Sequence, residues 1–168
     1  MHTREATAAD MAAIMELMSQ AKAYMRSLGS SQWGDDYPSA AHIEGDISRG
    51  EGYVMEDSAG VTAYMAITFN GEPAYDTLPT HPATPYATTH RLAVADRNKG
   101  RGVAFAFMLE AQKIALKAGV RLLRADTNFD NVRMLHIFDK LAMKYAGEVT
   151  YPHGGKRLAY EKVLHDEP

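Results

Sequence analysis

A short stretch of the chain combines two glycines with three cationic side chains: Arg97-Asn98-Lys99-Gly100-Arg101-Gly102-Val103-Ala104. A strand-like segment, His90 to Val94, precedes it, and a helix-like segment, Phe105 to Ala118, follows it. The backbone N–H groups of a first helical turn have no partner within the helix, and the helix dipole adds partial positive charge there. This order of strand, glycine loop and helix start therefore predicts a site for a phosphate or pyrophosphate group.

The residue types in this loop fit such a ligand. A side chain at either glycine would hold a phosphate away from the backbone. Arg97, Lys99 and Arg101 can add charge-assisted hydrogen bonds at the rim. The alternative that this is an ordinary surface loop with solvated cations would explain any one of the three charged residues. It would not explain why two glycines lie at the start of a helix. A dinucleotide-binding fingerprint would need a third glycine where Phe105 stands.

Composition narrows the class of protein. The chain has 168 residues, of which 46% are hydrophobic, so we expect a single domain over 1–168 with a substantial core. The net charge of −3 predicts no nucleic-acid partner, and the absence of cysteine excludes disulfides and a cysteine nucleophile. We expect no metal site. The sequence shows no signal peptide and no apolar run of membrane-spanning length, which predicts a cytoplasmic protein without a membrane partner.

Hydrophobic periodicity and turn residues predict the elements of the first half. A short strand is expected at His2–Ala6, and a capping box at Thr7–Asp10 starts a helix that ends at Gly29. A second helix and a hairpin follow, at Ala40–Ser48, Tyr53–Asp57 and Val61–Asn70.

The second half begins with a proline-rich loop over Gly71–Pro85 and a strand over Tyr86–Val94. After the glycine loop and its helix, we expect a strand at Val120–Thr127 and a helix at Asp130–Ala142. An antiparallel pair of strands, Tyr145–Thr150 and Leu158–Leu164, should follow, joined by a turn at Pro152-His153-Gly154-Gly155. This order predicts a mixed α/β sheet, in which the strands on either side of the glycine loop and its helix run parallel.

The loop and its flanks resemble the GNAT superfamily of acyl-CoA-dependent N-acyltransferases. Arg97-x-x-Gly100-x-Gly102 fits the family signature (Gln/Arg)-x-x-Gly-x-(Gly/Ala). The resemblance extends from about Tyr86 to Thr150. Leu92-Ala93-Val94 looks like the end of the family's fourth strand, and Leu122–Thr127 looks like its fifth strand. The segment from Asn128 to Leu141, with Asn131, Met134 and Phe138, looks like the helix that follows.

The resemblance implies a fold and a cofactor. The fold would be α/β (α+β), with a mixed, mostly antiparallel central sheet, splayed parallel strands 4 and 5, and helices on both faces. Acetyl-CoA would bind with its pyrophosphate at the glycine loop and its pantetheine arm on the backbone of Leu92, Ala93 and Val94, where one N–H would polarise the thioester carbonyl. Asn131 matches a position that hydrogen-bonds the cofactor near its thiol. Asn128 and Asn131 could instead cap the start of the following helix by bonding its backbone, which asparagine does well.

Proton transfer offers several candidates. A base must take the proton of the acceptor amine, and His90 is the titratable residue on the fourth strand, although a histidine satisfied by a neighbouring strand or by solvent is the simpler interpretation. Further candidates for the base are Tyr86, Asp126, Glu72 and His136.

The leaving thiolate raises a separate question. Many relatives carry a tyrosine as general acid at the position of Phe138, which has no proton to give. Tyr145 or Tyr160 could take that role, or the thiolate could leave unassisted.

The acceptor is less well defined by the sequence. By resemblance, Trp33, Tyr37 and Tyr75 would shape its pocket, although Trp33 could equally plug its loop onto the core. Acidic residues in these loops, Asp35, Asp36, Glu72 and Asp76, suggest a cationic acceptor, although exposed acids are common and a plain surface role is the simpler interpretation of Asp35 and Asp36.

The sequence thus favours an N-acetyltransferase that moves an acetyl group from acetyl-CoA to a primary amine of a small molecule, peptide or protein, with a possible homodimer. The alternatives are a non-catalytic acyl-CoA-binding or sensing module on the same fold and, less favoured, another kind of nucleotide-binding protein.

Overall fold

The computed structural model describes residues 1–81, 83–152 and 154–165. The chain divides into two compact units, Met1–Ile67 with His90–Met108, and Thr68–Thr89 with Leu109–Pro168. Strand β4 and helix α3 each have residues in both units, so we keep the single domain as a proposal. His153 of the last predicted turn lies outside the described residues.

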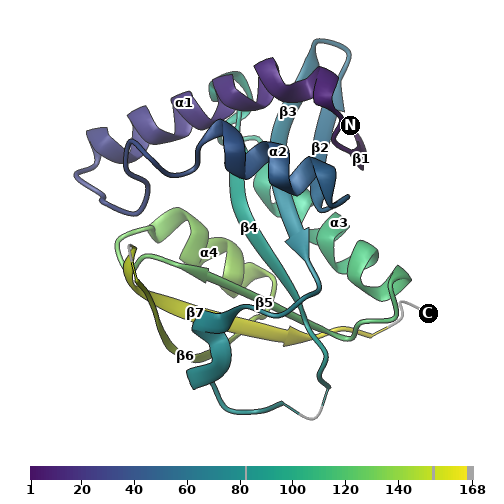
Figure 1. The fold of residues 1–168 in the computed structure, drawn as a ribbon, viewed down its shortest axis with the longest axis vertical. Helices are drawn as coiled ribbons and strands as arrows, with labels where there is room; N and C mark the ends of the chain where they lie inside the picture. Colours follow the sequence, from purple (N-terminus) through teal and green to yellow (C-terminus); the bar gives the residue numbers. More distant parts are fainter. Residues whose placement is uncertain (82, 153, 166–168) are drawn as a thin grey trace. The chain divides into compact units, whose positions relative to one another are not determined.

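Seven strands form one sheet in the order β1-β2-β3-β4-β5-β7-β6 (Figure 1). Strands β4 and β5 are parallel, and the other recorded pairs are antiparallel, which confirms the predicted mixed sheet. The strands are β1 (His2–Glu5), β2 (Gly52–Asp57), β3 (Gly60–Thr68), β4 (Ala87–Val94), β5 (Leu122–Thr127), β6 (Lys144–Tyr151) and β7 (Gly155–Val163).

Four α-helices lie between the strands: α1 (Met11–Ser27), α2 (Ala40–Ser48), α3 (Val103–Lys117) and α4 (Val132–Lys140). The predicted elements agree with these bounds to within a few residues. Helix α4 starts two residues later than expected because Asn131 is its N-cap: its backbone is not helical, and its side chain accepts a hydrogen bond from the Met134 N–H. The proline-rich loop contains a 3₁₀ helix, Pro73–Thr77, that the sequence did not predict.

The first unit has a core in which α1 and α2 pack with β2, β3 and the end of β4. Helix α1 places Ile14, Leu17, Met18 and Ala21 on one buried face, as the helical spacing of its apolar residues requires. Ile43 of α2 and Val54 of β2 belong to the same cluster of buried side chains.

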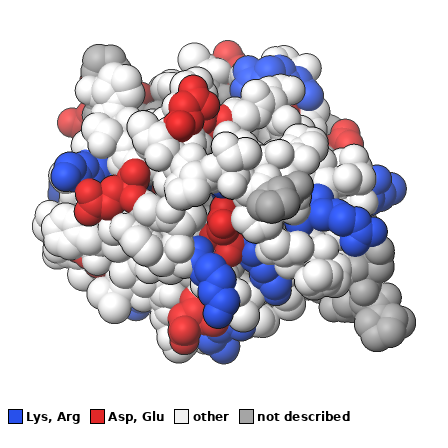
Figure 2. Space-filling view, turned by 90° about the horizontal axis from the view of Figure 1, so that it is seen from below, with Lys and Arg blue, Asp and Glu red and all other residues white. Residues whose placement is uncertain are grey.

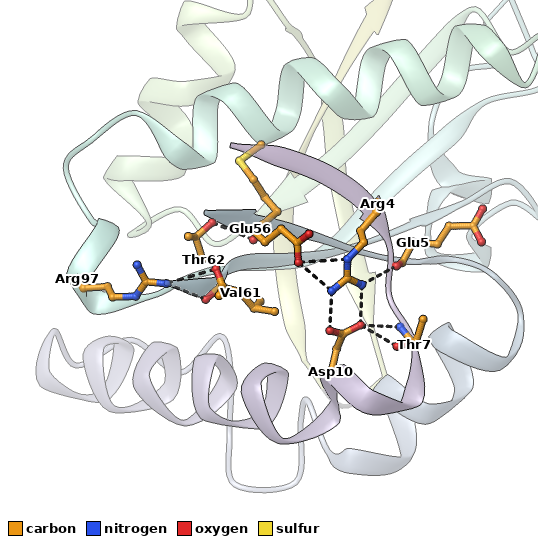
Figure 3. A network of polar contacts seen from close by, with 10 residues as sticks. Arg4, Glu5, Thr7, Asp10, Glu56, Val61, Thr62 and Arg97 are labelled. Atoms are coloured by element: carbon orange, nitrogen blue, oxygen red, sulfur yellow. Dashed lines mark hydrogen bonds and ion pairs between the residues drawn. The ribbon is translucent and has the colours of Figure 1, made fainter. Parts of the chain in front are cut away.

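The N-terminus of the first unit is held by a cluster of charges between two strands and the start of α1 (Figure 3). The Arg4 guanidinium donates to both carboxylate oxygens of Asp10 at 2.8 Å and to Glu56 at 2.9 and 3.2 Å. Asp10 also accepts from the backbone N–H of Thr7 at 2.8 Å, which completes the predicted capping box.

The second unit is built on β5, β6 and β7. Tyr75 and Leu78, from the segment before β4, pack with Val149 of β6 and Ala159 of β7 in one buried cluster. Phe138 of α4 is fully buried, and its ring lies 5.0 Å from that of Tyr160 on β7.

The Arg4–Asp10 contact makes stability depend on pH. Hydrogen bonds from Arg4 hold the pKa of Asp10 well below its ordinary value. The contact therefore stabilises the fold above the ordinary carboxyl pKa of about 3.9, and this contribution is lost as the pH falls below it. We expect Asp10→Asn to lower the free energy of unfolding at pH 7 by about 1.5–3 kcal/mol, the typical contribution of a hydrogen bond to a charged group. Urea unfolding between about pH 7 and pH 2 should show this difference shrinking below about pH 4.

The matched control is Asp35→Asn, because Asp35 pairs with Arg26 where the side chains are 89% and 70% exposed. An exposed pair contributes at most about 1 kcal/mol, so little change is expected. A difference for Asp10→Asn that is as large at pH 2 as at pH 7 would contradict the assignment.

Candidate active site

The glycine loop turns the chain from β4 into α3. A 3₁₀ helix, Asp96–Asn98, is followed by Gly100 and Gly102, whose φ angles of +75° and +77° lie in the left-handed region that favours glycine. The Ala106 N–H donates to the Gly102 carbonyl at 2.9 Å, at the start of α3. The N–H groups of Val103 and Ala104 come before this bond and so have no acceptor within the helix.

The space at both glycines is open. A Cβ built on Gly100 or Gly102 would meet no atom within 4 Å. The base of the loop is fixed by Asn98, which is 3% exposed and whose backbone N–H donates to the Ala95 carbonyl at 2.8 Å. Its side-chain Oδ1 is buried and has no hydrogen-bond partner in the described part of the chain. The loop thus offers unpaired helix N–H groups beside room for a ligand.

Two of the three cations predicted at the rim hold the loop in place. Arg97 donates to the Val61 carbonyl at 3.3 Å (Figure 3). It also pairs with Asp57 at 2.9 Å, and both contacts tie the loop to the β2–β3 hairpin. Lys99 pairs with Asp96, and its ammonium lies 4.4 Å from the centre of the Tyr24 ring. Arg101 is exposed and has no recorded partner among residues 1–81, 83–152 and 154–165, so it is the cation of this loop that can bind a ligand directly.

Strand β4 is distorted just before the loop. Its parallel pairing with β5 covers Ala87–Thr89, and the strand then continues through His90 to Val94. Arg91 has a φ of +56°, a left-handed conformation that is uncommon for a residue with a side chain. The strand therefore bends at Arg91, immediately before the backbone of Leu92, Ala93 and Val94.

A buried ion pair holds Arg91 in this conformation. Its Nε and Nη2 donate to the two carboxylate oxygens of Asp46 at 2.8 and 2.6 Å, and its Nη1 donates to the Tyr37 hydroxyl at 3.0 Å. Asp46, on α2, also accepts from the Tyr64 hydroxyl at 2.8 Å. The Asp46 side chain is 1% exposed and that of Arg91 is 11% exposed. Arg49, at the end of α2, also donates to Asp46 at 3.1 Å. Three elements of the first unit, α2, β3 and β4, thus meet at one carboxylate.

Sequence reasoning missed the roles of Arg91 and Asp46. The available signal was Asp46 itself, because it lies three residues after Ile43 and next to Ile47, on the apolar face of the predicted second helix. A charged residue on such a face requires a buried partner.

A second carboxylate site lies in the other unit. Oδ2 of Asp126, on β5, accepts hydrogen bonds from the hydroxyls of Tyr75 at 2.7 Å and Tyr151 at 2.8 Å. Burial raises the pKa of the Asp126 carboxyl above its ordinary value. A carboxylate with a raised pKa in a polar cluster is a candidate for proton transfer.

Comparisons with known proteins identify the family. Residues 14–143 match the model of the acetyltransferase (GNAT) family. The chain belongs to the GNAT family. A GNAT acetyltransferase from Streptococcus agalactiae is 32% identical over 98% of this chain and 96% of its own, with a TM-score of 0.88.

More distant structures share the fold. A GNAT acetyltransferase from Listeria monocytogenes is 22% identical over 97% of this chain and 94% of its own, with a TM-score of 0.77. The structure of yncA from Salmonella typhimurium, described with its cofactor acetyl-CoA, is 15% identical over the whole chain (100%) and 96% of its own, with a TM-score of 0.68. No curated protein matches the sequence.

His90 is poorly suited to act as the base. Burial, together with the charge of Arg91, lowers its pKa to about 3. Its imidazole is therefore neutral at pH 7, and a base works best when its pKa lies near the working pH.

The predicted acceptor residues take structural positions. Trp33 is buried in the core of the first unit, which favours the interpretation that it packs its loop onto that core. Tyr37 holds Arg91, and its ring lies 5.0 Å from that of His42. Tyr75 is 2% exposed and bonds Asp126. Tyr75 can therefore influence a ligand only through its hydroxyl, by way of the hydrogen bond to Asp126.

The two asparagines around the start of α4 make local contacts. Asn131 caps α4, and its amide donates to the Thr127 hydroxyl at 3.0 Å. Asn128 donates to Asp130 at 2.8 Å and accepts from Arg157 at 3.2 Å. Both amides thus have the local roles that their residue type favours, and cofactor binding by them stays a prediction.

Three aromatic rings lie together around Phe138, the position at which the family resemblance implied an acidic tyrosine. The Tyr160 ring is 5.0 Å from the ring of Phe138 and 5.7 Å from that of Tyr145. Tyr145 is 57% exposed, whereas Phe138 is fully buried. Tyr160 is therefore the hydroxyl-bearing ring in direct contact with Phe138.

Within the described residues, no group of three or more metal-ligating side chains could hold an ion, and no helix is long and apolar enough to cross a membrane. On the face drawn in Figure 2, basic and acidic side chains lie interspersed.

The Arg91–Asp46 pair can be tested against a more exposed arginine of the same region. Arg91→Met should lower the free energy of unfolding by about 3 kcal/mol, because it removes the two-atom partner of the buried Asp46 carboxylate and leaves only the half-exposed Arg49 guanidinium, at 3.1 Å, to bind it. Arg97→Met removes an arginine whose side chain is 43% exposed and should change stability by about 1 kcal/mol or less. Urea unfolding of both variants measures the difference. Equal losses of unfolding free energy in the two variants would contradict a larger contribution of the buried Arg91–Asp46 pair to stability.

Proposed function

We propose that this GNAT protein is an N-acetyltransferase that transfers the acetyl group of acetyl-CoA to a primary amine of a small molecule, peptide or protein. The observation that carries the proposal is the pair of left-handed glycines with open space at the start of α3, directly after the bend at Arg91. Such a helix start binds phosphates. The acetyl-CoA in the Salmonella neighbour is consistent with this ligand.

The loop residues fit the cofactor's pyrophosphate. Backbone N–H groups of Gly102, Val103 and Ala104 would donate to it, and the exposed Arg101 would add charge. The orphaned Oδ1 of Asn98 at the base of the loop is a buried acceptor that a donor of the ligand or a bound water would satisfy.

The bent part of β4 would bind the rest of the cofactor. Backbone groups of Leu92, Ala93 and Val94 would pair with the amides of the pantetheine arm, as a peptide pairs with a strand edge. The Arg91–Asp46 pair would position this backbone. When bound, the cofactor supplies an activated acetyl thioester, and the protein's part is to hold the reactants and move protons.

Departure of the thiolate needs no strong acid in this proposal. A thiol with a pKa near about 8.5 is an acceptable leaving group, and the buried Phe138 cannot donate a proton. Tyr145 and Tyr160 remain the candidate hydroxyls. The same buried Phe138 is the observation that favours the alternative, a module that binds acyl-CoA without turnover. Release of free thiol in the presence of a panel of amines distinguishes the two. A cytoplasmic location and a homodimer belong to the proposal as well.

Cofactor binding can be tested at Gly102 with a matched glycine as control. Gly102→Val should weaken the binding of acetyl-CoA, measured by isothermal titration calorimetry, by about tenfold or more, because the side chain fills the space at the helix start. Gly119→Val is the control, because Gly119 has the same φ of +77°, equally open surroundings and a place at the other end of α3. Both variants introduce the same backbone strain, so only the first should lose affinity.

Circular dichroism should confirm that both variants are folded. Unchanged affinity in a folded Gly102→Val variant would contradict the assignment of the loop. Binding without release of thiol for every amine of the panel would instead support the non-catalytic alternative.

A further inference from the structure

Asp126, which is half-buried, differs from the buried carboxylates Asp10 and Asp46 in how its charge is satisfied. Asp10 is bound on both oxygens by Arg4, and Asp46 is bound on both oxygens by Arg91. Asp126 has no ion-pair partner in the described part of the chain, and Oδ2 alone receives its two hydrogen bonds, from Tyr75 and Tyr151. A carboxylate that served only to stabilise the fold would be expected to have a cation beside it.

The arrangement leaves one oxygen for a ligand. Both tyrosine hydroxyls donate to Oδ2, so the two lone pairs of that oxygen are occupied. Oδ1 accepts no hydrogen bond from residues 1–81, 83–152 and 154–165. Any further donor, or a proton, must therefore bind at Oδ1. The two tyrosines come from different segments, the 3₁₀ helix Pro73–Thr77 and strand β6, and fix the orientation of the carboxylate between them.

The surroundings of Asp126 suit an ammonium group. Tyr75, Tyr86 and Tyr151 belong to the same cluster of packed side chains, and the rings of Tyr75 and Tyr86 lie 6.0 Å apart. The face of the Tyr86 ring already lies against the Arg124 guanidinium, whose central carbon is 4.7 Å from the ring centre, so the attraction for an ammonium comes from the carboxylate. A carboxylate oxygen accepts a hydrogen bond from an N–H donor more strongly than a neutral acceptor does. A carboxylate among tyrosine rings therefore favours a primary ammonium over a neutral or anionic ligand.

We infer that Oδ1 of Asp126 binds the ammonium group of the acceptor and takes its proton. The inference rests on the proposed function, and it names the residue that prepares the amine. One N–H bond of the ammonium breaks, and an O–H bond forms on Asp126. The positive charge of the amine and the negative charge of the carboxylate are lost together, and the nitrogen keeps the lone pair that it needs for attack. Tyr75 and Tyr151 are positioning residues, because they act through the carboxylate.

The other charges around this site keep the carboxylate available. Arg157, on β7, lowers the pKa of Asp126 by its charge, against the larger rise caused by burial, and donates hydrogen bonds to Asn128 and to the Lys156 carbonyl. Arg124, on β5, pairs with Glu161 at 2.9 Å. Burial, with the charge of Asp126 and a smaller effect of Glu72, raises the pKa of Tyr75, so that the hydroxyl keeps its proton and remains a donor.

The kinetic test uses the pH dependence of kcat/KM with an amine that the wild type acetylates. Asp126→Asn should lower kcat/KM by about 10²–10⁴-fold, the usual contribution of a base, with acetyl-CoA affinity unchanged by calorimetry. Tyr151→Phe removes a donor that stabilises the carboxylate, so the pKa of Asp126 should rise. The acid limb of the profile should then move to higher pH, by about one unit. Asp139→Asn, an exposed acid on α4, is the control and should behave as the wild type.

A second measurement needs no turnover. In protein with ¹³C-labelled aspartate carboxyls, the Asp126 signal is assigned by its absence from Asp126→Asn. Addition of n-butylammonium chloride should lower the pKa of Asp126. Two controls report non-specific effects: n-butanol should leave the Asp126 titration unchanged, and n-butylammonium should leave the signal of the exposed Asp139 unchanged. A cation that binds the charged form of a carboxylate lowers its pKa.

The outcomes separate the two claims. If acetyl-CoA binds but no amine releases thiol, the proposed function fails, and the carboxyl titration alone decides whether Asp126 binds an ammonium. If the wild type acetylates an amine but Asp126→Asn retains kcat/KM within about threefold, or the acid limb of Tyr151→Phe does not move, the inference is wrong while the proposed function stands. An Asp126 pKa that does not respond to n-butylammonium also overturns it.

Discussion

The first unit depends on one buried ion pair, Arg91–Asp46. Arg91 must adopt a left-handed backbone conformation inside a strand, which costs about 1–2 kcal/mol for a residue with a side chain. The conformation persists because Asp46 binds the guanidinium on two atoms, and Tyr37, Tyr64 and Arg49 add further hydrogen bonds to the pair. Breaking this arrangement would leave a charge in the interior, which is far more costly than the strain. The bend of β4, and with it the direction in which the chain enters the glycine loop, is therefore fixed by a residue on α2.

The same logic explains the loop itself. Arg97 and Lys99 look like ligand-binding cations in the sequence, yet their charges bind Asp57 and Asp96. Their role in the structure is to hold the loop against the β2–β3 hairpin and α1, so that the N–H groups at the start of α3 remain uncovered. The proposed anion site of this unit therefore consists mainly of backbone groups. Binding to them does not require flexible side chains to become ordered. The buried carboxylates Asp10 and Asp46 are bound on both oxygens by guanidinium groups, and Asp126, which has no such partner among the described residues, is where we place acceptor chemistry.

Much of this could be predicted from the sequence, for identifiable reasons. Periodicity and turn residues gave α2 its bounds, Ala40–Ser48, and the signature around Gly100 and Gly102 gave the loop, because both depend on neighbours in the chain. The roles of Arg91 and Asp46 could not be assigned in this way, because their contact joins residues 45 positions apart. Asp126 was one of several candidate bases, and only the contacts of Tyr75 and Tyr151 distinguish it from Glu72 or His136. His90 stood out by its place in the sequence, but its pKa depends on burial and on the charge of Arg91, which only the structure shows.

The central claim is that the backbone at the start of α3 binds the pyrophosphate of coenzyme A. Amide NMR of ¹⁵N-labelled protein tests it most directly, by titration with coenzyme A and, separately, with pantetheine, which lacks the pyrophosphate. The account predicts that the amide signals of Gly100, Gly102, Val103 and Ala104 move with coenzyme A and stay in place with pantetheine. Signals that do not move with coenzyme A, or that move equally with both ligands, would contradict it.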